Sequence, residues 1–296
     1  MRFSIRYVTD YRYESPVEDN LNVLRVTPAT TETQRCEDFT LRVEPTARLG
    51  RFRDYFGTEV IEVGVVPPHE HLTLEARARV STTAPPGAVE GPFDAVEEKA
   101  YREAGAEFLF VADPPPSHEL FEELSSETRA ESPLATLRRL VEVVAARFEY
   151  RPGSTYVGST VDDLLSGEAG VCQDFVHLSL MLLRRHGIAA RYVSGYLFAA
   201  PEGDGAESVE VATHAWLEAL LPAADSGGPP TWVGADPTNR RLTGEEYVRI
   251  GHGRDYSDLP PIKGMYRGTA SGRMDAKVTM TRIDPDGGQP EGSTAS

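Results

Sequence analysis

The amino-acid sequence predicts an α+β protein in which strands come first, helices follow and strands return. Residues 1–83 contain runs of alternating apolar and polar residues and of β-branched residues, the pattern of half-buried strands. Residues 93–187 place apolar residues at helical spacing, and from residue 190 the spacing of two returns. Strands and helices gathered in separate parts of a chain are typical of an α+β fold.

Five strands are expected in the N-terminal 83 residues, where turn residues such as Glu44-Pro45 and Phe56-Gly57 separate the apolar runs. An antiparallel sandwich or meander is the architecture that such a series favours. Cys36 stands at the start of one run between charged residues, and we expect it to be structural. The expected strands are 3–8, 21–26, 39–43, 60–66 and 72–80.

Residues 84–92 are rich in proline and glycine, and we expect them to link this N-terminal domain to a core. Pro133–Phe148 has the strongest helical periodicity of the core, with its apolar residues on one face. Weaker helices are expected at 95–105, 119–126 and 161–165. We assign residues 93–283 to the core and expect the glycine-, proline- and serine-rich tail at 284–296 to be disordered.

The net charge of −16 argues against nucleic acid and against an anionic membrane surface as partners, because both select basic proteins. No apolar run approaches the roughly 20 residues of a membrane span. Residues 1–7 alternate in polarity and therefore predict a strand and not a signal peptide. Two distant cysteines form no disulfide framework or zinc motif, which favours a reducing cytoplasm. His69 and His71 are spaced for a metal, but without further ligands nearby we expect surface histidines.

The chain is organised around Cys172, which precedes a strongly periodic apolar helix beginning at Phe175 and ending at Gly187. At the N-terminus of a helix, unpaired backbone N–H groups and the helix dipole stabilise a thiolate over a thiol. Gly170 lets the backbone enter tightly, so that the sulfur can face a cleft. The pattern therefore favours a nucleophile, and a small buried cysteine is the alternative.

Two strands beyond this helix carry His214 and Asp236. The strands 209–221 and 231–237 flank a loop of proline, glycine and polar residues that can only be a turn. If the hairpin is centred on residue 225, His214 and Asp236 are cross-strand neighbours with Cβ atoms ~5 Å apart. An imidazole held by a carboxylate is an oriented general base. Taken singly, His214 could be a core histidine and Asp236 a turn residue.

Three sequence motifs together resemble the transglutaminase-like superfamily: Gly-Val-Cys172-Gln-Asp-Phe, Thr-His214-Ala-Trp-Leu-Glu and Gly-Ala-Asp236-Pro-Thr-Asn. Their order along the chain matches that family. The N-terminal β region, with Asp54-Tyr-Phe-Gly, is similar to the additional domain of bacterial members, and Thr58 stands where that family pattern has Asn. The resemblance covers nearly the full chain to about residue 283.

The resemblance implies a papain-like α+β core, with a nucleophile helix packed on an antiparallel sheet. It implies a thioester mechanism in which Cys172 attacks a peptide or carboxamide carbonyl, His214 moves the proton and Asp236 orients the imidazole. We expect no metal and no cofactor, since no phosphate-binding or calcium-binding motif is present.

Four further residues are expected to line or support the site. Trp216 is expected to wall it, or else to be a packed hairpin aromatic. Asp174 and His177 lie three apart on the helix and are expected to support it structurally. Tyr256 is placed at the cleft by resemblance alone.

Three functions stay open at this point. A cytoplasmic cysteine hydrolase acting on a peptide or protein amide is favoured, because a thioester is easier to expose to water than to shield from it. Acyl transfer to an amine uses the same residues, and a non-catalytic binding module is the third possibility. The sequence does not indicate an oligomeric state.

Overall fold

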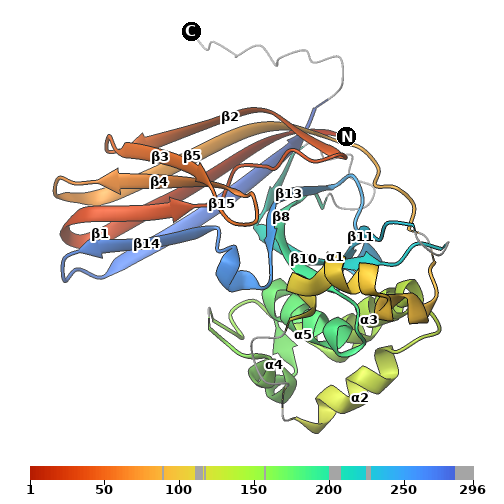
Figure 1. Cartoon of the computed structure of the whole chain (residues 1–296). Helices are drawn as coiled ribbons and strands as arrows, with labels where there is room; N and C mark the ends of the chain where they lie inside the picture. The colour runs from red at the N-terminus through yellow and green to blue at the C-terminus, as the bar shows by residue number, and fades with distance from the viewer. Residues whose placement is uncertain are drawn as a thin grey trace.

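The computed structural model describes residues 1–88, 90–110, 116, 118–156, 158–199, 208–224 and 228–283. Strands and helices gather in separate parts of the molecule, which confirms the α+β fold (Figure 1). The predicted loop at 201–207, the tip of the loop after residue 224 and the predicted disordered tail at 284–296 lie outside the described residues.

β1 (Arg2–Leu24) is the strand on which the N-terminal sheet is built (Figure 1). Buried and more exposed side chains alternate along its first eight or so residues, as expected for a strand with one face in the core. Its first half pairs with β5 (His69–Thr82) on one side and with β15 (Gly272–Arg282) on the other. The register shifts after Arg12, and the second half pairs with β4 (Glu59–Val65) and β14 (Ile262–Arg267). β1 therefore belongs to two layers, where the sequence pattern had predicted two separate strands.

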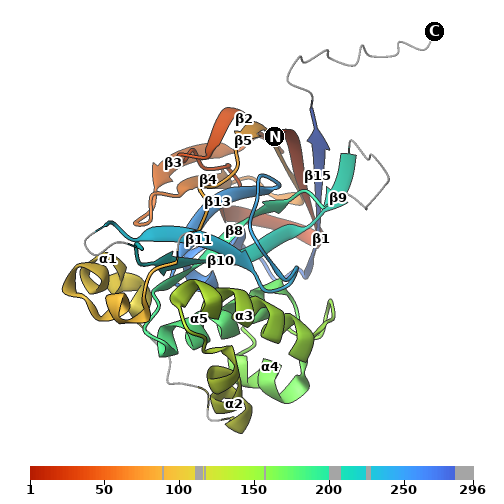
Figure 2. The same cartoon turned by 90° about the vertical axis from the view of Figure 1, so that its right-hand side faces the viewer.

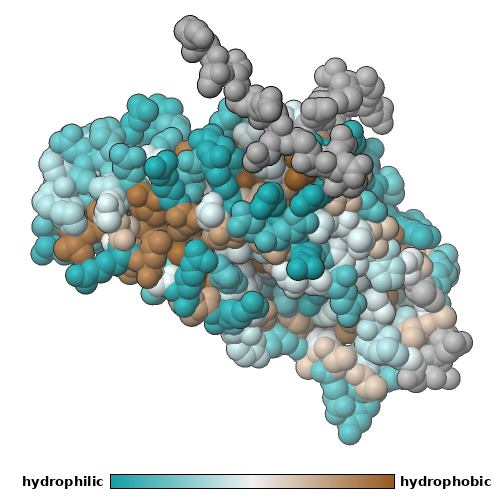
Figure 3. All heavy atoms as spheres, turned by 90° about the horizontal axis from the view of Figure 1, so that it is seen from above, coloured by the Kyte–Doolittle hydropathy of each residue, from teal (hydrophilic) through white to brown (hydrophobic). Residues whose placement is uncertain are grey.

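The edges of these layers leave apolar side chains partly exposed. Within the described residues, β2 (Gln34–Glu44) pairs only with β5, and β3 (Arg48–Arg53) pairs only with β4. Phe39 and Leu41 of β2 are half-buried against the core, and Phe52 of β3 is 47% exposed. Seen from above, an apolar area lies on the part of the surface that this sheet forms, at the left of Figure 3.

The core has its own sheet, with β12 (Arg241–Leu242), β11 (Thr231–Asp236), β10 (Thr213–Leu221), β8 (Ala190–Leu197) and β13 (Tyr247–Gly253) in that spatial order. Every described neighbouring pair in it is antiparallel. Helix α5 (Cys172–Arg185) packs on β10 and β8, and α3 (Pro133–Arg147) packs on α5 (Figure 2). The apolar side chains of α5 and α3 bury themselves together with the facing side chains of β10 in one core.

Shorter elements complete this layer. They are η1 (Phe93–Glu97), α1 (Lys99–Leu109), α2 (Glu119–Thr128), β6 (Glu149–Tyr150), α4 (Val161–Gly167), β7 (Ala169–Gly170) and η2 (Tyr256–Asp258). Side chains fix several helix starts. Ser132 caps α3 by accepting the N–H of Ala135, and Thr160 and Asp163 form a capping box at α4.

The predicted strand 209–221 is wrong as a single element. Residues Ser208–Val211 form β9, which pairs with β15 in the N-terminal sheet, whereas β10 begins at Thr213 in the core sheet. β14 and β15 also lie within the range 93–283, yet they pair with β1. The division into domains at these boundaries stays a prediction, but the strands after residue 261 belong to the N-terminal sheet. The reason is that both sides of β1 need hydrogen-bonding partners, and the end of the chain supplies them.

The two sheets also contact each other directly. Tyr196 of β8 is buried in the apolar core of the N-terminal sheet and donates a hydrogen bond to the carbonyl oxygen of Val26 (3.0 Å). The side chain of Gln34 bonds the backbone N–H and C=O of Arg249 on β13 (2.7 and 2.8 Å). The N-terminal sheet is therefore anchored to β8 and β13, the strands next to the candidate site.

Gly195 is a point where this packing leaves no room for a side chain. A Cβ atom there would lie 2.1 Å from the carbonyl oxygen of Val248 and 2.5 Å from the indole of Trp216. We predict that Gly195→Ala lowers the free energy of unfolding by about 1–3 kcal/mol, because overpacking forces neighbouring groups apart.

The measurement is urea unfolding followed by circular dichroism, with Gly64→Ala as the matched control. Gly64 is also a strand glycine, but a Cβ atom there would meet no atom within 4 Å. The control is expected to stay within about 0.5 kcal/mol of the wild type. Equal stability of the two variants would contradict the assigned packing.

Candidate functional site

Cys172 is the first residue of α5, as the sequence predicted, and it is partly exposed. The carboxylate of Asp174 reaches back to accept the N–H of Val171, the residue before the cysteine (2.8 Å). The hydroxyl of Thr155 donates to the same carboxylate oxygen (2.6 Å). Asp174 is buried, and these bonds fix the turn that presents the cysteine, whereas its supporting role in the site stays a prediction.

Gly170 explains how this turn can be so tight. A Cβ atom at Gly170 would lie 2.8 Å from the side chain of Leu164 and 3.0 Å from that of Asp174. A side chain at this position would therefore push α4 or the capping carboxylate away from the helix start.

His214 and Asp236 are joined by a hydrogen bond of 2.7 Å between Nε2 and Oδ2. The predicted register of their hairpin is nevertheless wrong, because Leu217 pairs with Ala235 and the ladder is shifted by two residues. A shift of two keeps every side chain on its face of the sheet. His214 and Asp236 are consequently diagonal neighbours, and their side chains are long enough to meet.

Asp236 is fully buried and accepts hydrogen bonds from several donors besides His214. The phenol of Tyr247 and the amide of Asn239 donate to Oδ2 (2.8 and 2.7 Å), and the backbone N–H groups of Thr238 and Asn239 donate to Oδ1. Burial is the largest influence on the pKa of Asp236 and would raise it, but these bonds and the charge of His214 hold the pKa below its usual range. The carboxylate is therefore ionised and fixed in place.

The sequence analysis assigned no role to Tyr247 or Asn239. Asn239 could have been found, because an Asp with an Asn three residues later is the spacing of a turn whose side chains bond to one another. Tyr247 stands on β13, and nothing in the sequence around it indicates that β13 brings it to Asp236. Arg241 in turn donates to the Tyr247 hydroxyl (3.1 Å).

The imidazole of His214 is mostly buried and strongly basic. Burial is the largest influence on its pKa and lowers it, but hydrogen bonds to Asp236 and Cys172, with the charges of both, outweigh burial and raise the pKa to about 9. Cys172 thus lies close enough to His214 to act on its protonation. The structure brings the helix start and the hairpin to one place.

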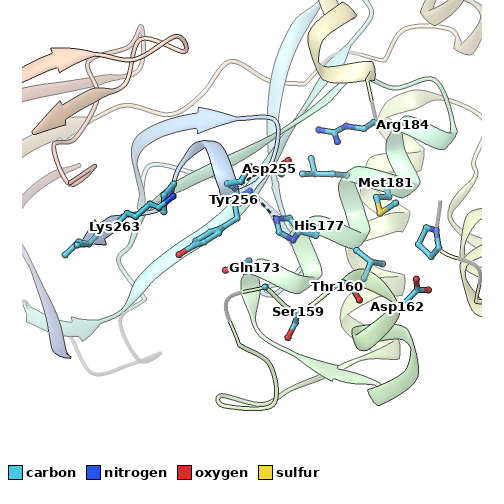
Figure 4. Close-up of a pocket in the computed structure, with 17 residues that line it drawn as sticks. Ser159, Thr160, Asp162, Gln173, His177, Met181, Arg184, Asp255, Tyr256 and Lys263 are labelled. Atoms are coloured by element: carbon cyan, nitrogen blue, oxygen red, sulfur yellow. Dashed lines mark hydrogen bonds between the residues drawn. The ribbon is translucent and has the colours of Figure 1, made fainter. Parts of the chain in front are cut away.

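A cavity of about 840 Å³ lies along one face of α5 (Figure 4), and Cys172, His214 and Asp236 are not among its lining residues. Gln173, next to Cys172 in the chain, and His177, one helical turn further, line it from α5. Tyr256 lines it from η2, and its backbone N–H donates to Nε2 of His177 (3.2 Å). The structure therefore brings His177 and Tyr256 together at the cavity. Further lining residues are Thr160, Asp162, Leu180, Met181, Asp255 and Lys263.

Of the two roles that the sequence analysis left open for Trp216, the structure gives the geometry of a packed hairpin aromatic. Its side chain is 2% exposed, and its ring lies behind His214 and against Tyr247, with centroids 6.3 and 5.3 Å apart. Trp216 is two residues from His214 on the same strand, so both side chains lie on the same face of the sheet. On that face, neighbouring side chains enclose the indole. Trp216 therefore supports the imidazole from behind.

The remaining candidates lie away from this site. Cys36 is half-buried on β2, where burial raises the pKa of its thiol. Both ring nitrogens of His69 have neighbours, Asn20 and the carbonyl oxygen of Pro67. Within the described ranges, no group of three or more His, Cys, Asp or Glu side chains could hold a metal ion. None of the described helices has the length and hydropathy needed to cross a membrane.

Two family models match the chain. Residues 3–81 match the bacterial transglutaminase-like N-terminal region, and residues 122–237 match the transglutaminase-like superfamily.

Known proteins match it over nearly its full length. An uncharacterized protein of Mycobacterium tuberculosis (strain ATCC 25618 / H37Rv) is 32% identical over 96% of this chain and 94% of the relative. An uncharacterized protein of Mycobacterium leprae (strain TN) is 33% identical over 95% of this chain and 99% of the relative. The crystal structure of a putative cysteine protease from Cytophaga hutchinsonii superposes with a TM-score of 0.73 at 25% identity, covering 96% of this chain and 92% of that one. These similarities confirm the resemblance that the three motifs predicted: the chain belongs to the transglutaminase-like superfamily and carries the bacterial transglutaminase-like N-terminal region.

Proposed function

We propose that the protein is a cysteine-dependent enzyme that breaks a peptide or carboxamide bond through a thioester, with Cys172, His214 and Asp236 as a catalytic triad. The observation that carries the proposal is the hydrogen bond between His214 and the fully buried Asp236, next to a cysteine at a helix N-terminus. Each part has a chemical purpose: a nucleophile, a base that accepts its proton, and a carboxylate that orients the base.

In the first step, the sulfur of Cys172 attacks the carbonyl carbon of the substrate while His214 carries the proton. Because Nε2 of His214 is engaged by Asp236, Nδ1 is the ring nitrogen that exchanges the proton with the thiol and the leaving group. The tetrahedral oxyanion is stabilised by the backbone N–H groups of Cys172 and Gln173, since the first N–H groups of a helix have no partner within the helix.

In the second step, His214 donates its proton to the leaving nitrogen, and the carbon–nitrogen bond breaks to give the thioester. Water, deprotonated by the imidazole, then attacks the thioester carbon and releases the acid and the thiol. We favour hydrolysis over transfer to an amine, because shielding a thioester from water demands more structure than exposing it to water. The similarity to a structure described as a cysteine protease supports the same choice. The cytoplasmic location stays a prediction.

The first prediction concerns the thiol and needs no substrate. In a Cys36→Ser background, iodoacetamide is expected to alkylate Cys172 at pH 6 at least tenfold faster than in the same protein carrying His214→Ala, because protonated His214 stabilises the thiolate. The rate is followed by mass spectrometry between pH 5 and 10. Equal rates in the two proteins would favour a packed cysteine and a binding module.

The second prediction concerns the raised pKa of His214. The imidazole is expected to titrate near pH 9 in NMR spectra of the folded protein and at lower pH in Asp236→Asn. Because the pKa is above the unfolded value of about 6.5, the stability that protonated His214 contributes is complete below pH 6.5 and is lost as the pH rises through 9. Unchanged titration in Asp236→Asn would show that the carboxylate does not hold the proton.

The third prediction concerns turnover. Cys172→Ala is expected to abolish the release of ammonia or of new amino termini from reduced β-casein, and His214→Ala to abolish it nearly. Asp236→Asn is expected to leave a measurable remainder, roughly 10³–10⁴-fold below the wild type. Full activity in the Cys172→Ala protein would end the proposal, and incorporation of a fluorescent primary amine in place of water would assign the reaction to transfer.

A further inference from the structure

β14 presents an open edge next to the cavity. Within the part of the chain that the structure describes, β14 pairs with β1 alone. The carbonyl oxygen of Pro261 accepts the N–H of Arg25 (2.8 Å), and hydrogen-bonded pairs alternate along an antiparallel ladder. The backbone groups of Lys263 and Met265 therefore face β1. Those of Ile262, Gly264 and Tyr266 face away from it, where a further strand can bind them.

The side chains of β14 leave this edge accessible. A Cβ atom at Gly264 would lie 2.4 Å from the side-chain oxygen of Asn22, so this residue packs against β1 without a side chain. Met265, which pairs with Leu21, is 65% exposed on the outer face of the layer. Lys263 is also exposed and adds a positive charge, whereas the guanidinium of Arg267 is paired with the carboxylates of Glu18 and Asp19 (3.1 and 2.9 Å). Because Ile262 and Lys263 at the start of this edge also line the cavity, the occupant that we favour is a polypeptide that reaches the cavity, and not the same strand of a second copy.

The same strand leads into the proposed active site. Ile262 and Lys263 line the cavity of about 840 Å³ that Gln173 and His177 line from α5. In Figure 4, Lys263 and Tyr256 lie outside the helix, and Gln173 lies at the helix start on the side of Tyr256. Leu180 and Met181 add an apolar surface to the cavity. An extended chain hydrogen-bonded to β14 therefore continues into the cavity, where it meets Gln173, the residue after Cys172.

We propose that the substrate is an extended segment of polypeptide, which adds as a strand to the free edge of β14 and passes through the cavity to Cys172. This inference rests on the proposed function for the chemistry but not for the binding. Six residues of strand span about 20 Å, so the edge selects unfolded chains or long flexible segments over small amides. Backbone hydrogen bonds supply affinity without requiring one sequence, and the positive charge of Lys263 favours acidic or neutral segments.

Amide hydrogen exchange tests the edge directly. The Cys172→Ala protein is incubated with reduced β-casein, an unfolded polypeptide, and exchange is followed by mass spectrometry. The amides of Ile262, Gly264 and Tyr266, which face the free edge, are expected to exchange at least fivefold more slowly with casein present. β2, which also has a free edge but lies away from the cavity, is the internal control and is expected to exchange unchanged. Exchange in β14 that casein does not slow, or equal slowing in β2, would overturn the proposal.

A pair of variants isolates the backbone group. Tyr266→Pro removes the N–H that faces the free edge, and Tyr266→Ala keeps that N–H. Both remove the ring that packs on Tyr13 (centroids 5.0 Å apart) and the hydroxyl bond to Ala270. In the Cys172→Ala background, fluorescein-labelled β-casein is expected to bind Tyr266→Pro at least fivefold more weakly than Tyr266→Ala. Equal affinity, or no binding of casein by the Cys172→Ala protein itself, would overturn the proposal.

The two proposals fail separately. Alkylation of Cys172 reports on the thiol and His214, whereas exchange at β14 reports on the edge. If His214 accelerates alkylation of Cys172 but casein does not slow exchange in β14, the proposed triad stands and the proposed extended substrate is contradicted. If casein slows exchange in β14 but Cys172 reacts as an ordinary cysteine, binding at the β14 edge is supported and the proposed triad is contradicted.

Discussion

The site depends on one interaction, the burial of the Asp236 carboxylate. A carboxylate without solvent is costly unless its oxygens are hydrogen-bonded, and here donors come from three parts of the chain. His214 on β10, Tyr247 on β13 and Asn239 in the turn after β11 all point to it. Satisfying Asp236 therefore fixes the relative positions of three strands, and the imidazole is held as a consequence of the same geometry.

The N-terminal sheet contributes to this arrangement through β8 and β13. Arg249 of β13 is held at its backbone by Gln34, and the ladder of β13 continues to Tyr247, which bonds Asp236. The chain then passes through η2, where Tyr256 meets His177, and enters β14 beside β1. One wall of the cavity is consequently made by residues that lie between the two sheets. The return of the chain from the core to the N-terminal sheet thus supplies part of the cavity wall, and α5 and the residues before α4 supply most of the rest.

Local chemistry is what made much of the site predictable from the sequence. Cys172 was identified because glycine before a periodic helix and a glycine after it define both helix ends, and His214 and Asp236 because two strands flank an unmistakable loop. The hairpin register was predicted two residues away from the real one. The pairing of His214 with Asp236 survived because an even shift preserves the face. The two roles of Trp216 could not be separated from the sequence, because a period of two gives the face of a residue and not what covers that face.

The features that the sequence did not reveal are those created by long-range pairing. Nothing near Tyr247 indicates Asp236, and nothing near Ile262 indicates that β14 will lie beside residues 20–24 of β1. Such contacts depend on which edges remain unpaired after the nearer strands have met, and this is a property of the whole chain. For the same reason, the N-terminal sheet is not structurally independent of the core. β1 needs the C-terminal strands for its hydrogen bonds, and the cavity beside Cys172 needs the path by which those strands reach it.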